Sequence, residues 1–367
     1  MILEKGTGVP NYVACLYRKC QEIDPANQYV FFQPNAFRTL GVTEVASTPR
    51  GLLGAALFDS LRVQRLIRQA NLDIFHGPSH FLPLRKLAGV KYVVTVHDLA
   101  FRVMPEQYGW KHRWYFGWQV ARSLKMADAV AADSLNTKKD IIRFYGLPEE
   151  RIHVVHLGAS EQFSQMAERP GERLIAGRYF FSVTTHPARK NVLGAMEAFA
   201  RFAAGSDLSY VIAGLMGEPQ RRELLACAER LGIQQKIRLF GYADDQQLIN
   251  LYCHAEFFIY PSFYEGFGLP PVEAMACGCP VIASNTSSLP EVMPDDQWLV
   301  DPYDIGNMAQ KMQRMLALSP DERRQIGAGN QRHARNFTWE KTAARMIEIF
   351  EVLHRNESRP SARPVSK

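Results

Sequence analysis

Residues 257–284 read FFIYPSFYEGFGLPPVEAMACGCPVIAS, and the fold and the site that we expect are organised around this stretch. Its first residues, Phe257–Tyr260, form an apolar run that predicts a buried parallel strand, because a half-buried strand would alternate polar and apolar residues. A loop with two glycines follows, and Pro270 and Pro271 suit the first turn of a helix. Cys279–Ala283 predicts the next strand. The order strand, loop, helix, strand predicts an α/β fold.

Two carboxylates follow the first predicted strand, where open α/β sheets bind their ligands. Glu265 lies in the loop with Gly266 and Gly268, and we expect Glu273 in the first turn of the helix. Backbone amides of such a loop and helix start favour an anion such as phosphate, whereas carboxylates favour hydroxyl groups. The plain alternative is a surface acid at 265 and a favourable first-turn charge at 273. Together with the glycines, the pair predicts a site for a nucleotide sugar.

Residues 265–284, EGFGLPPVEAMACGCPVIAS, resemble the donor-site signature of the retaining glycosyltransferases of family 4, with seven residues between Glu265 and Glu273. The resemblance covers nearly the whole chain and is strongest over residues 178–300. It implies the GT-B fold, in which two Rossmann-like domains face a central cleft. It also implies that the C-terminal domain holds the nucleotide-sugar donor and the N-terminal domain the acceptor.

The composition agrees with two domains of a cytoplasmic protein. The chain has 367 residues, of which 47% are hydrophobic, and no apolar run approaches the roughly 20 residues that cross a membrane. The first residues lack the apolar stretch of a signal peptide, and the six cysteines show no metal-binding spacing. Lys and Arg exceed Asp and Glu by 43 to 37, a mild excess that favours anionic ligands or an anionic membrane surface.

We expect four segments along the chain. An N-terminal, acceptor-binding Rossmann-like domain covers residues 1–165, and a C-terminal, nucleotide-sugar-binding one covers residues 166–335. The resemblance implies that a helix over residues 336–355 returns to the N-terminal domain. Residues 356–367 are polar and are predicted to form a disordered tail. The linker between the domains is predicted at Gln165–Gly177, which is polar and contains Pro170 and Gly171.

The N-terminal domain supplies two candidate donor-binding positions. Met1–Tyr12 resembles the family's first strand and glycine loop, although only Met1–Leu3 precede the loop. We expect Gly8 to let this loop approach the diphosphate, and a plain turn is the alternative. His97 ends the apolar run that starts at Lys91, and the resemblance implies a place near the donor sugar. A lone histidine more often binds a backbone carbonyl, but the position at a strand end favours function.

Arg189 and Lys190 resemble the family's phosphate-binding pair. They precede a helix that is predicted from Asn191, so two cations and a helix N-terminus would neutralise a leaving diphosphate. A solvated surface pair is the alternative. Many relatives carry Gly-Arg six or seven residues before the lysine, whereas this chain has Val183 and Thr184. Lys190 is therefore expected to share its task with Arg189 or with a cation of the N-terminal domain.

The resemblance implies catalysis without a metal ion or a cofactor. The residues with expected catalytic roles are His97, Arg189, Lys190 and Glu265. The residues expected to bind the donor, with Glu273 on the ribose and Tyr242 near the base, are Gly8, Gly266, Phe267, Gly268, Leu269, Glu273 and Tyr242. Asp244 and Asp245 predict a helix N-cap rather than a metal-binding pair. Because no covalent nucleophile is evident, the acceptor would attack from the face that the diphosphate leaves, with retention.

The preferred donor is GDP-mannose. The HDL, PARKN and TSSLPEV elements, at residues 97–99, 187–191 and 286–292, resemble bacterial mannosyltransferases of O-antigen and exopolysaccharide synthesis. The acceptor would be a glycan or a lipid-linked glycan of a surface polysaccharide such as lipopolysaccharide. Three alternatives remain open: a transferase that uses a UDP-sugar, a catalytically silent GT-B partner subunit, and a nucleotide-sugar epimerase.

A predicted helix of the N-terminal domain is rich in aromatic residues. Trp110, Trp114 and Trp118 recur every four residues, with Lys111 and Arg113 interleaved, so one helix face carries the tryptophans. We favour a core helix, in which at least one tryptophan is buried. The alternative is an interfacial helix with tryptophans among the headgroups of an anionic membrane, which would place the protein peripherally on the inner face. Nucleic acid is not an expected partner, because no basic cluster of the recognition type is present.

Overall fold

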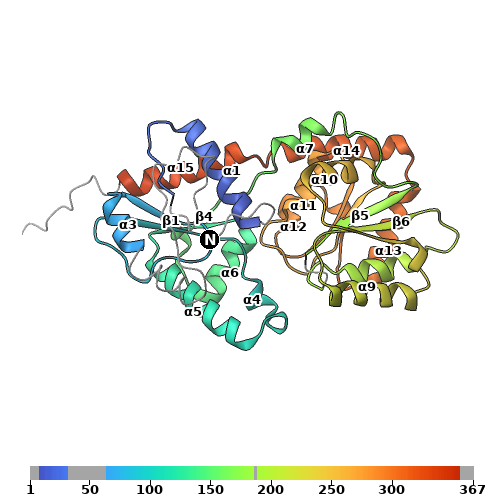
Figure 1. The fold of residues 1–367 in the computed structure, drawn as a ribbon, viewed down its shortest axis with the longest axis horizontal. Helices are drawn as coiled ribbons and strands as arrows, with labels where there is room; N and C mark the ends of the chain where they lie inside the picture. Colours follow the sequence, from blue (N-terminus) through green and yellow to red (C-terminus); the bar gives the residue numbers. More distant parts are fainter. Residues whose placement is uncertain (1–7, 32–62, 186–187, 356–367) are drawn as a thin grey trace, which may run out of the picture. The chain divides into compact units, whose positions relative to one another are not determined.

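The computed structural model describes residues 8–31, 63–185 and 188–355, and the chain divides into two compact units. Unit 1 combines Met1–His156 with Trp339–Lys367, and unit 2 is Leu157–Thr338. Each unit contains a parallel sheet with helices on both faces (Figure 1). The α/β class that the sequence predicts is therefore confirmed.

The sheet of unit 1 has four described strands, all parallel, in the order β1-β2-β3-β4. The strands are β1 (Ile74–Gly77), β2 (Lys91–Val96), β3 (Ala129–Ala132) and β4 (Ile152–Val154). Tyr92, Val93 and Val94 of β2 are all fully buried although successive side chains point to opposite faces, because helices cover both faces of this central strand.

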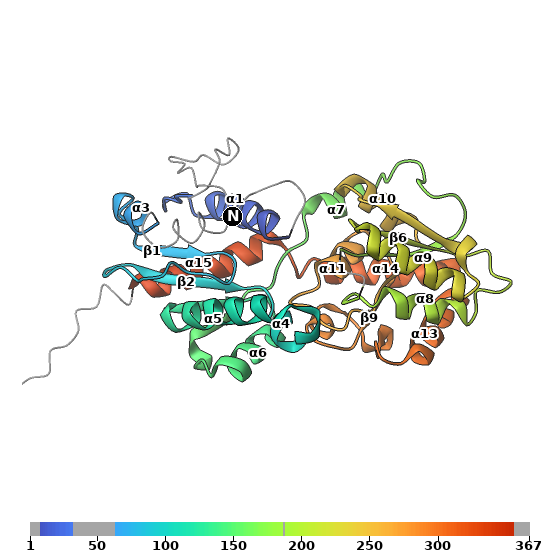
Figure 2. The same cartoon turned by 60° about the horizontal axis from the view of Figure 1, so that its bottom comes forward.

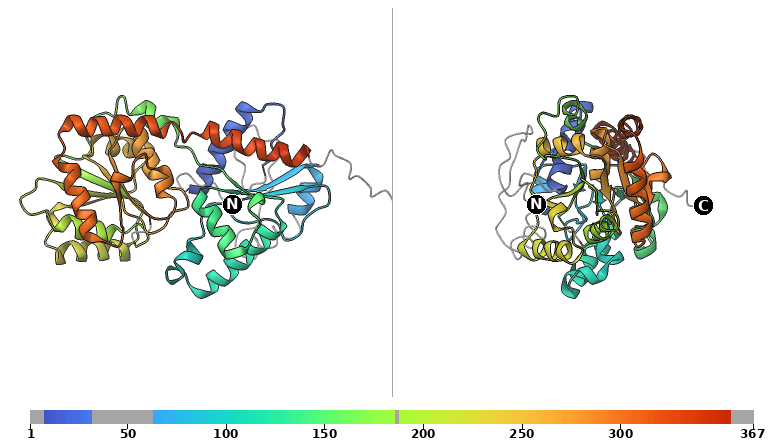
Figure 3. Two further views of the ribbon diagram at one scale, coloured as in Figure 1. Left: turned by 180° about the vertical axis from the view of Figure 1, so that it is seen from behind. Right: turned by 90° about the vertical axis from the view of Figure 1, so that its right-hand side faces the viewer.

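Helices lie on both faces of this sheet. They are α1 (Gly8–Ile23), α3 (Val63–Gln69), α4 (Ala100–Val103), η2 (Pro105–Gln107), α5 (Trp110–Met126), α6 (Leu135–Tyr145), η3 (Glu149–Arg151) and α15 (Trp339–Arg355). Helices α1 and α15 cover one face, and α5 and α6 cover the other (Figures 1 and 2). Helix α15 packs along α1 with Trp339, Ala343 and Met346 buried (Figure 3).

The sheet of unit 2 has six described strands, all parallel, in the order β10-β9-β8-β5-β6-β7. The strands are β5 (Tyr179–Val183), β6 (Ser209–Ala213), β7 (Ile237–Gly241), β8 (Phe258–Tyr260), β9 (Val281–Ser284) and β10 (Leu299–Val300). Phe180 stacks on Tyr210 at 4.3 Å and on Phe257 at 5.1 Å between ring centroids. The apolar run that begins at Phe257 is thus a buried strand, as predicted.

The helices of unit 2 are α7 (Glu161–Met166), α8 (Val192–Ala200), α9 (Glu218–Arg230), η4 (Gln234–Lys236), α10 (Asp245–His254), α11 (Leu269–Ala276), α12 (Leu289–Val292), η5 (Asp296–Trp298), α13 (Ile305–Ala317) and α14 (Pro320–Ala334). Figure 1 shows α10, α11 and α14 on one face of the sheet and α9 and α13 on the other. No helix in the described part of the chain is long and apolar enough to cross a membrane.

The segment before β5 differs from the predicted linker, because it packs on unit 2. Phe163 of α7 is buried there, and its carbonyl accepts a hydrogen bond from Cys277 Sγ at 3.4 Å. Farther along, Asn250 Nδ2 donates to the carbonyls of Pro170 at 2.6 Å and Glu172 at 2.9 Å. The chain therefore passes from unit 1 to unit 2 at 156/157, earlier than the predicted boundary at 165/166.

The prediction of buried tryptophans in α5 is wrong. Trp110 and Trp114 are each 72% exposed, and Trp118 is 48% exposed. Smaller residues of α5 are buried instead: Val120 packs in the core with β2, and Gly117 faces Phe101 and Arg102 of α4. A period of four residues places the tryptophans on one face, but it does not say which face points inward. The predicted strand at Met1–Leu3 and the predicted tail at 356–367 lie outside the described residues.

Candidate active site

The loop between β8 and α11 takes its shape from Gly268. This residue has φ = +108°, and a Cβ atom added there would lie 2.7 Å from Leu289 Cδ2, so glycine fits where other residues would be strained. Helix α11 begins at the next residue, Leu269, with Pro270 in its first turn. Glu273 is therefore the fifth residue of the helix and lies in its second turn, which corrects the predicted first-turn position.

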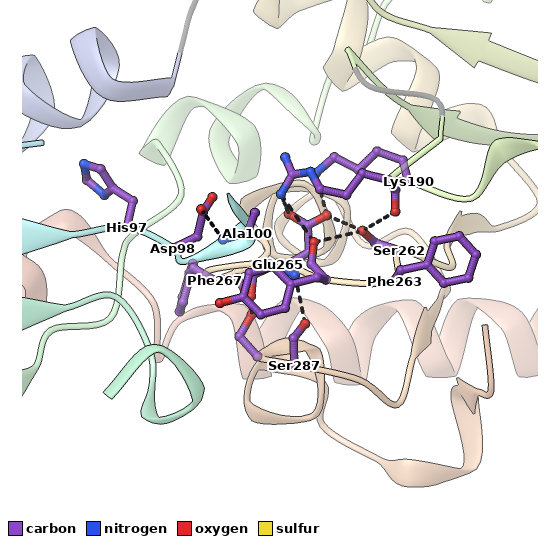
Figure 4. A network of polar contacts seen from close by, with 12 residues as sticks. His97, Asp98, Ala100, Lys190, Ser262, Phe263, Glu265, Phe267 and Ser287 are labelled. Carbon is purple, nitrogen blue, oxygen red and sulfur yellow. Dashed lines mark hydrogen bonds and ion pairs between the residues drawn. The ribbon is translucent and has the colours of Figure 1, made fainter. Parts of the chain in front are cut away.

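Two cations converge on the Glu265 carboxylate, which is buried at the carboxyl end of the sheet (Figure 4). Lys190 Nζ lies 2.6 Å from Oε1, and Arg189 Nη1 lies 3.7 Å from Oε2. The Ser262 hydroxyl also donates to Oε1, and Lys190 donates to the hydroxyl of Tyr260. The predicted phosphate-binding pair and the predicted sugar-binding carboxylate therefore lie in direct contact.

Lys190 and Arg189 determine the protonation state of Glu265. Burial alone would favour the neutral acid. The charges of Lys190 and Arg189, together with hydrogen bonds from Lys190 and Ser262, outweigh this effect and lower the pKa of Glu265 below its ordinary value. Glu265 is thus an ionised carboxylate at neutral pH.

The turn that carries the two cations is tied to the loop that carries Glu265. The Arg189 carbonyl accepts hydrogen bonds from Phe263 N at 3.0 Å and from Ser262 Oγ at 3.1 Å. The next residue, Asn191, is the N-cap of α8, and its side chain donates to the Pro302 carbonyl at 2.7 Å. These contacts hold Arg189 and Lys190 at the start of α8, where the helix dipole favours negative charge.

Two serines that the sequence analysis did not single out hold the Glu265 loop. Ser287 Oγ accepts a hydrogen bond from Glu265 N at 2.9 Å (Figure 4). Ser288 Oγ donates to the carbonyls of Glu265 at 3.0 Å and Phe267 at 2.8 Å. The Phe267 side chain is buried and lies 5.7 Å from the Phe337 ring, so its aromatic group packs in the interior of unit 2. The TSSLPEV element therefore positions the backbone of the Glu265 loop.

Glu273 has a different environment from Glu265. Burial raises the pKa of Glu273 to about 7, and the nearby charge of Asp245 adds to the increase. The hydroxyl of Tyr252 acts in the opposite direction. Asp244, as predicted, is the N-cap of α10 and accepts a hydrogen bond from Gln247 N at 2.8 Å. Glu273 thus changes charge near neutral pH, whereas Glu265 does not.

Tyr242 follows the end of β7 and is 57% exposed. At this end of the sheet the Gly214 amide donates to the Gly241 carbonyl at 2.6 Å, which joins the loops after β6 and β7. Gly214 has φ = +135°, and a Cβ atom there would lie 1.7 Å from the Thr184 carbonyl oxygen. The Tyr242 ring is therefore exposed, whereas the backbone at the end of β7 that precedes it is closely packed.

His97 lies in unit 1 and has an acceptor at each ring nitrogen. Nδ1 lies 2.8 Å from Asp133 Oδ2, and Nε2 lies 2.9 Å from the Pro78 carbonyl oxygen. A carboxylate and a carbonyl only accept hydrogen bonds, so this arrangement favours the imidazolium form, which carries a hydrogen on both nitrogens. Burial opposes this charge, but Asp133 and the two hydrogen bonds outweigh it and raise the pKa of His97.

Two neighbouring histidines and a tyrosine are kept in their neutral forms. His80 lies 5.6 Å from the His97 ring between centroids, and burial and the His97 charge lower its pKa. His76 shares a hydrogen bond with Thr95 at 2.8 Å, and burial lowers its pKa to about 3. Tyr12 places its ring edge 4.8 Å from His97, and burial raises its pKa. The one protonated histidine of this group is thus His97.

The structure brings together some of the predicted site residues and separates others. In unit 2, Arg189, Lys190 and Glu265 share one ion-pair network, beside the loop of Gly266, Phe267, Gly268 and Leu269. In unit 1, His97 is bound to Asp133 rather than free at the strand end. Gly8 is the first residue of α1 rather than part of a loop, and a Cβ atom there would meet nothing within 4 Å. The contacts within unit 1 therefore do not require a glycine at this position, and its approach to the diphosphate stays a prediction.

Two family models match the chain, one in each half. The model of glycosyl transferases group 1 matches residues 172–333, and that of Glycosyltransferase Family 4 matches residues 21–163. O-antigen chain mannosyltransferase B of Escherichia coli is 32% identical over 291 residues, which are 76% of this chain and 74% of that protein. MMP alpha-(1->4)-mannosyltransferase of Mycolicibacterium hassiacum is 30% identical over 311 residues, which are 80% of this chain and 74% of that protein.

A solved structure agrees with the fold. Sucrose-phosphate synthase from Thermosynechococcus elongatus has a TM-score of 0.76 and 21% identity, over 96% of this chain and 95% of that chain. At this identity the likeness shows the fold alone, which is that of two Rossmann-like units. With the sequence relatives, it establishes that the chain is a member of glycosyltransferase family 4 with the GT-B fold, and that it is a glycosyltransferase.

Proposed function

We propose that the protein transfers mannose from GDP-mannose to a glycan or lipid-linked glycan acceptor, with retention of the anomeric configuration. The observation that carries this proposal is the ion-pair network of Lys190, Arg189 and Glu265 at the start of α8. In our proposal the two cations of this network bind the diphosphate, and the ionised carboxylate beside them binds sugar hydroxyls. The preference for mannose rests on the 32% identity to an O-antigen chain mannosyltransferase.

The catalytic step in this proposal is departure of the nucleoside diphosphate. Lys190 and Arg189 stabilise the negative charge that develops on the leaving oxygen, an electrostatic contribution that is usually the largest in catalysis. The loop amides at Gly268 and Leu269 add to this stabilisation. In our proposal, Lys190 and Arg189 take the role that a metal ion has in other transferases. Glu265 holds hydroxyls of the donor sugar, and its charge favours the oxocarbenium character of the transition state.

The remaining donor contacts are assigned by place in the fold. Glu273 binds the ribose hydroxyls, and Tyr242 lies beside the base. We propose that His97 acts as a fixed positive charge, because its nitrogens are both engaged with acceptors. The reaction would take place in the cytoplasm, with a peripheral contact at the inner face of the membrane, where a lipid-linked acceptor is available for surface polysaccharide synthesis.

The test is an incubation of the purified protein with GDP-mannose, UDP-glucose, UDP-galactose and UDP-N-acetylglucosamine, each with and without an acceptor oligosaccharide. We expect GDP and a mannosylated product only with GDP-mannose and acceptor, an α-anomeric signal for the new linkage by NMR, and unchanged turnover in EDTA. Turnover with a UDP-sugar would overturn the donor assignment. A new sugar formed without acceptor would indicate an epimerase, and no binding of any nucleoside diphosphate would indicate a silent partner subunit.

A further inference from the structure

Four aromatic side chains of α5 form an exposed surface, which we call the tryptophan face and define as Trp110, Trp114, Tyr115 and Trp118. Their exposed fractions are 72%, 72%, 45% and 48%. The other two of the chain's five tryptophans are buried, with exposed fractions of 4% and 5%. A row of exposed aromatic residues costs free energy in water and marks a surface that is covered by a partner.

The tryptophan face is hollowed rather than flat. A groove of about 520 Å³ runs over α4, η2 and α5, and its walls are the three tryptophans together with Arg102, Pro105 and Arg113. Gly117 also lines the groove, where it faces Phe101 and Arg102 of α4. The groove is large enough for headgroups or side chains to enter between the aromatic rings.

The charge around this face is mainly positive. Helix α5 carries Lys111, Arg113, Arg122 and Lys125 and no acidic residue. Lys111 Nζ lies 5.5 Å from the centroid of the Trp110 ring, so a cation accompanies the first tryptophan of the face. The neighbouring segment η2 adds one acid, Glu106, which leaves the surface positively charged. A partner with negative charge and an apolar interior therefore matches it.

We propose that the tryptophan face docks on the surface of a membrane that contains anionic phospholipid. Tryptophan rings are enriched at the headgroup level, where the apolar ring and the polar N–H are both accommodated. Lys and Arg beside them are attracted by the negative surface potential. Helix α5 then lies in the plane of the interface, as a helix with this distribution of aromatic and basic residues does. This docking surface locates the proposed membrane contact on α5. Only its biological role, access to a lipid-linked acceptor, rests on the proposed function.

The experiment measures cosedimentation of the full chain with vesicles, without donor or acceptor. Its outcome is therefore independent of transferase activity. We expect binding to vesicles of phosphatidylglycerol and phosphatidylcholine at low salt. Binding should be lost in about 1 M NaCl, where screening acts within about 3 Å. Vesicles of phosphatidylcholine alone should bind at least about tenfold less protein, because they lack the surface potential.

Two variants separate the aromatic from the basic contribution. Trp110→Ser with Trp114→Ser should weaken vesicle binding at least about tenfold at unchanged melting temperature, because both rings are already exposed. Lys111→Glu with Arg113→Glu should abolish it. The matched controls lie on the exposed helix α9 of unit 2: Leu225→Ser for the apolar change, and Arg221→Glu with Arg222→Glu for the charge change. Both controls should bind vesicles like the wild type.

Three results would overturn the proposal. The first is a wild-type protein that ignores anionic vesicles, and the second is a tryptophan variant that binds them as tightly as the wild type. The third is a soluble neutral mannan that quenches the tryptophan fluorescence of the wild type, but not of the Trp110 and Trp114 variant, while vesicles have no effect. That result would make the groove a glycan-binding surface instead.

Discussion

Lys190 Nζ lies 2.6 Å from Glu265 Oε1, so the cation that we assign to the donor diphosphate is already neutralised by the carboxylate that we assign to the donor sugar. The pair is mostly buried, with 11% and 8% of the two side chains exposed. A diphosphate that binds Lys190 must therefore either share this lysine with Glu265 or displace the Glu265 carboxylate from it. The complete nucleotide sugar gives Glu265 new partners in its hydroxyl groups, whereas a nucleoside diphosphate does not.

Glu265→Gln should therefore bind GDP more tightly than the wild type and still turn over more slowly. Loss of the negative charge frees Lys190 and Arg189 for phosphate, while loss of the carboxylate contact to the sugar lowers kcat by at least about tenfold, or about 1.4 kcal/mol. Calorimetry of GDP binding and initial rates with GDP-mannose measure the two effects.

The control for this change is Glu197→Gln on α8, which breaks the exposed pair of Glu197 with Arg230, 3.1 Å apart, in the same unit. It should change neither quantity, and both proteins should melt as cooperatively as the wild type. Weaker GDP binding by Glu265→Gln would show that the carboxylate positions the cations for phosphate rather than competes with it.

Lys190→Ala should weaken the binding of GDP much more than the binding of guanosine, because its partner in the complex is phosphate. A hydrogen bond to a charged group is worth about 1.5 to 3 kcal/mol, which sets the expected loss for GDP. Titration of both ligands against the variant measures the difference. Arg222→Ala, on the exposed helix α9, is the matched loss of one positive charge and should alter neither affinity. Equal losses for GDP and guanosine in Lys190→Ala would contradict the phosphate role.

Glu273 should make nucleotide affinity depend on pH around 7. Its pKa is raised from 4.5 to about 7, so the carboxyl group becomes an ionised acceptor for ribose hydroxyls only as the pH rises through this value. We expect GDP affinity to increase between pH 6 and pH 8 in the wild type, and this increase to be absent in Glu273→Gln. Calorimetry across this range measures it.

The same shift affects folding in the opposite direction. The folded protein binds more protons than the unfolded chain between pH 4.5 and about 7, so Glu273 lowers stability progressively as pH rises through that window. Glu273→Gln should therefore gain melting temperature over the wild type toward pH 8 and lose this advantage at pH 5. A constant difference across the range would contradict the raised pKa.

Asp133→Asn should lower the pKa of His97, because the amide no longer stabilises the imidazolium. In the wild type this pKa is raised, so the ion pair contributes stability that is complete below the ordinary histidine pKa of 6.5 and is lost as pH rises through the folded pKa. The variant should consequently be most destabilised in acid and recover at high pH. An NMR titration of His97 and melting curves at several pH values measure both effects. Asp128→Asn, which alters the more exposed pair with Lys86, should leave His97 unchanged.

The strand, loop and helix around Glu265 were predictable because each has a local signal. An apolar run gives the strand, two glycines the loop, and two prolines the helix start. The contact of Lys190 with Glu265 was not, since 75 residues separate them and only the pairing of β5 with β8 brings their strands together. Ser262 had a usable signal, because it lies two residues after the buried strand that ends at Tyr260.

Asp133 had the same kind of signal. It directly follows the apolar strand β3, and His97 directly follows β2, so adjacent parallel strands carry both residues to one edge of the sheet. The tryptophans of α5 had a signal with two meanings, since a helical period fits a buried face as well as an exposed one. The buried face is the one that carries smaller residues: Val120 packs in the core with β2, and Gly117 lies against Phe101 and Arg102 of α4, where an indole ring would not fit.

The return of α15 to unit 1 has a consequence for synthesis on the ribosome. Unit 2 is continuous in sequence and can fold as soon as it emerges, because domains generally fold as units. Unit 1 is translated first, but it cannot be completed until α15 emerges from the ribosome. Until then, the surface of α1 against which α15 packs is open to water. The half of the enzyme that is translated first is therefore completed last, and during that interval it is the part that chaperones would bind.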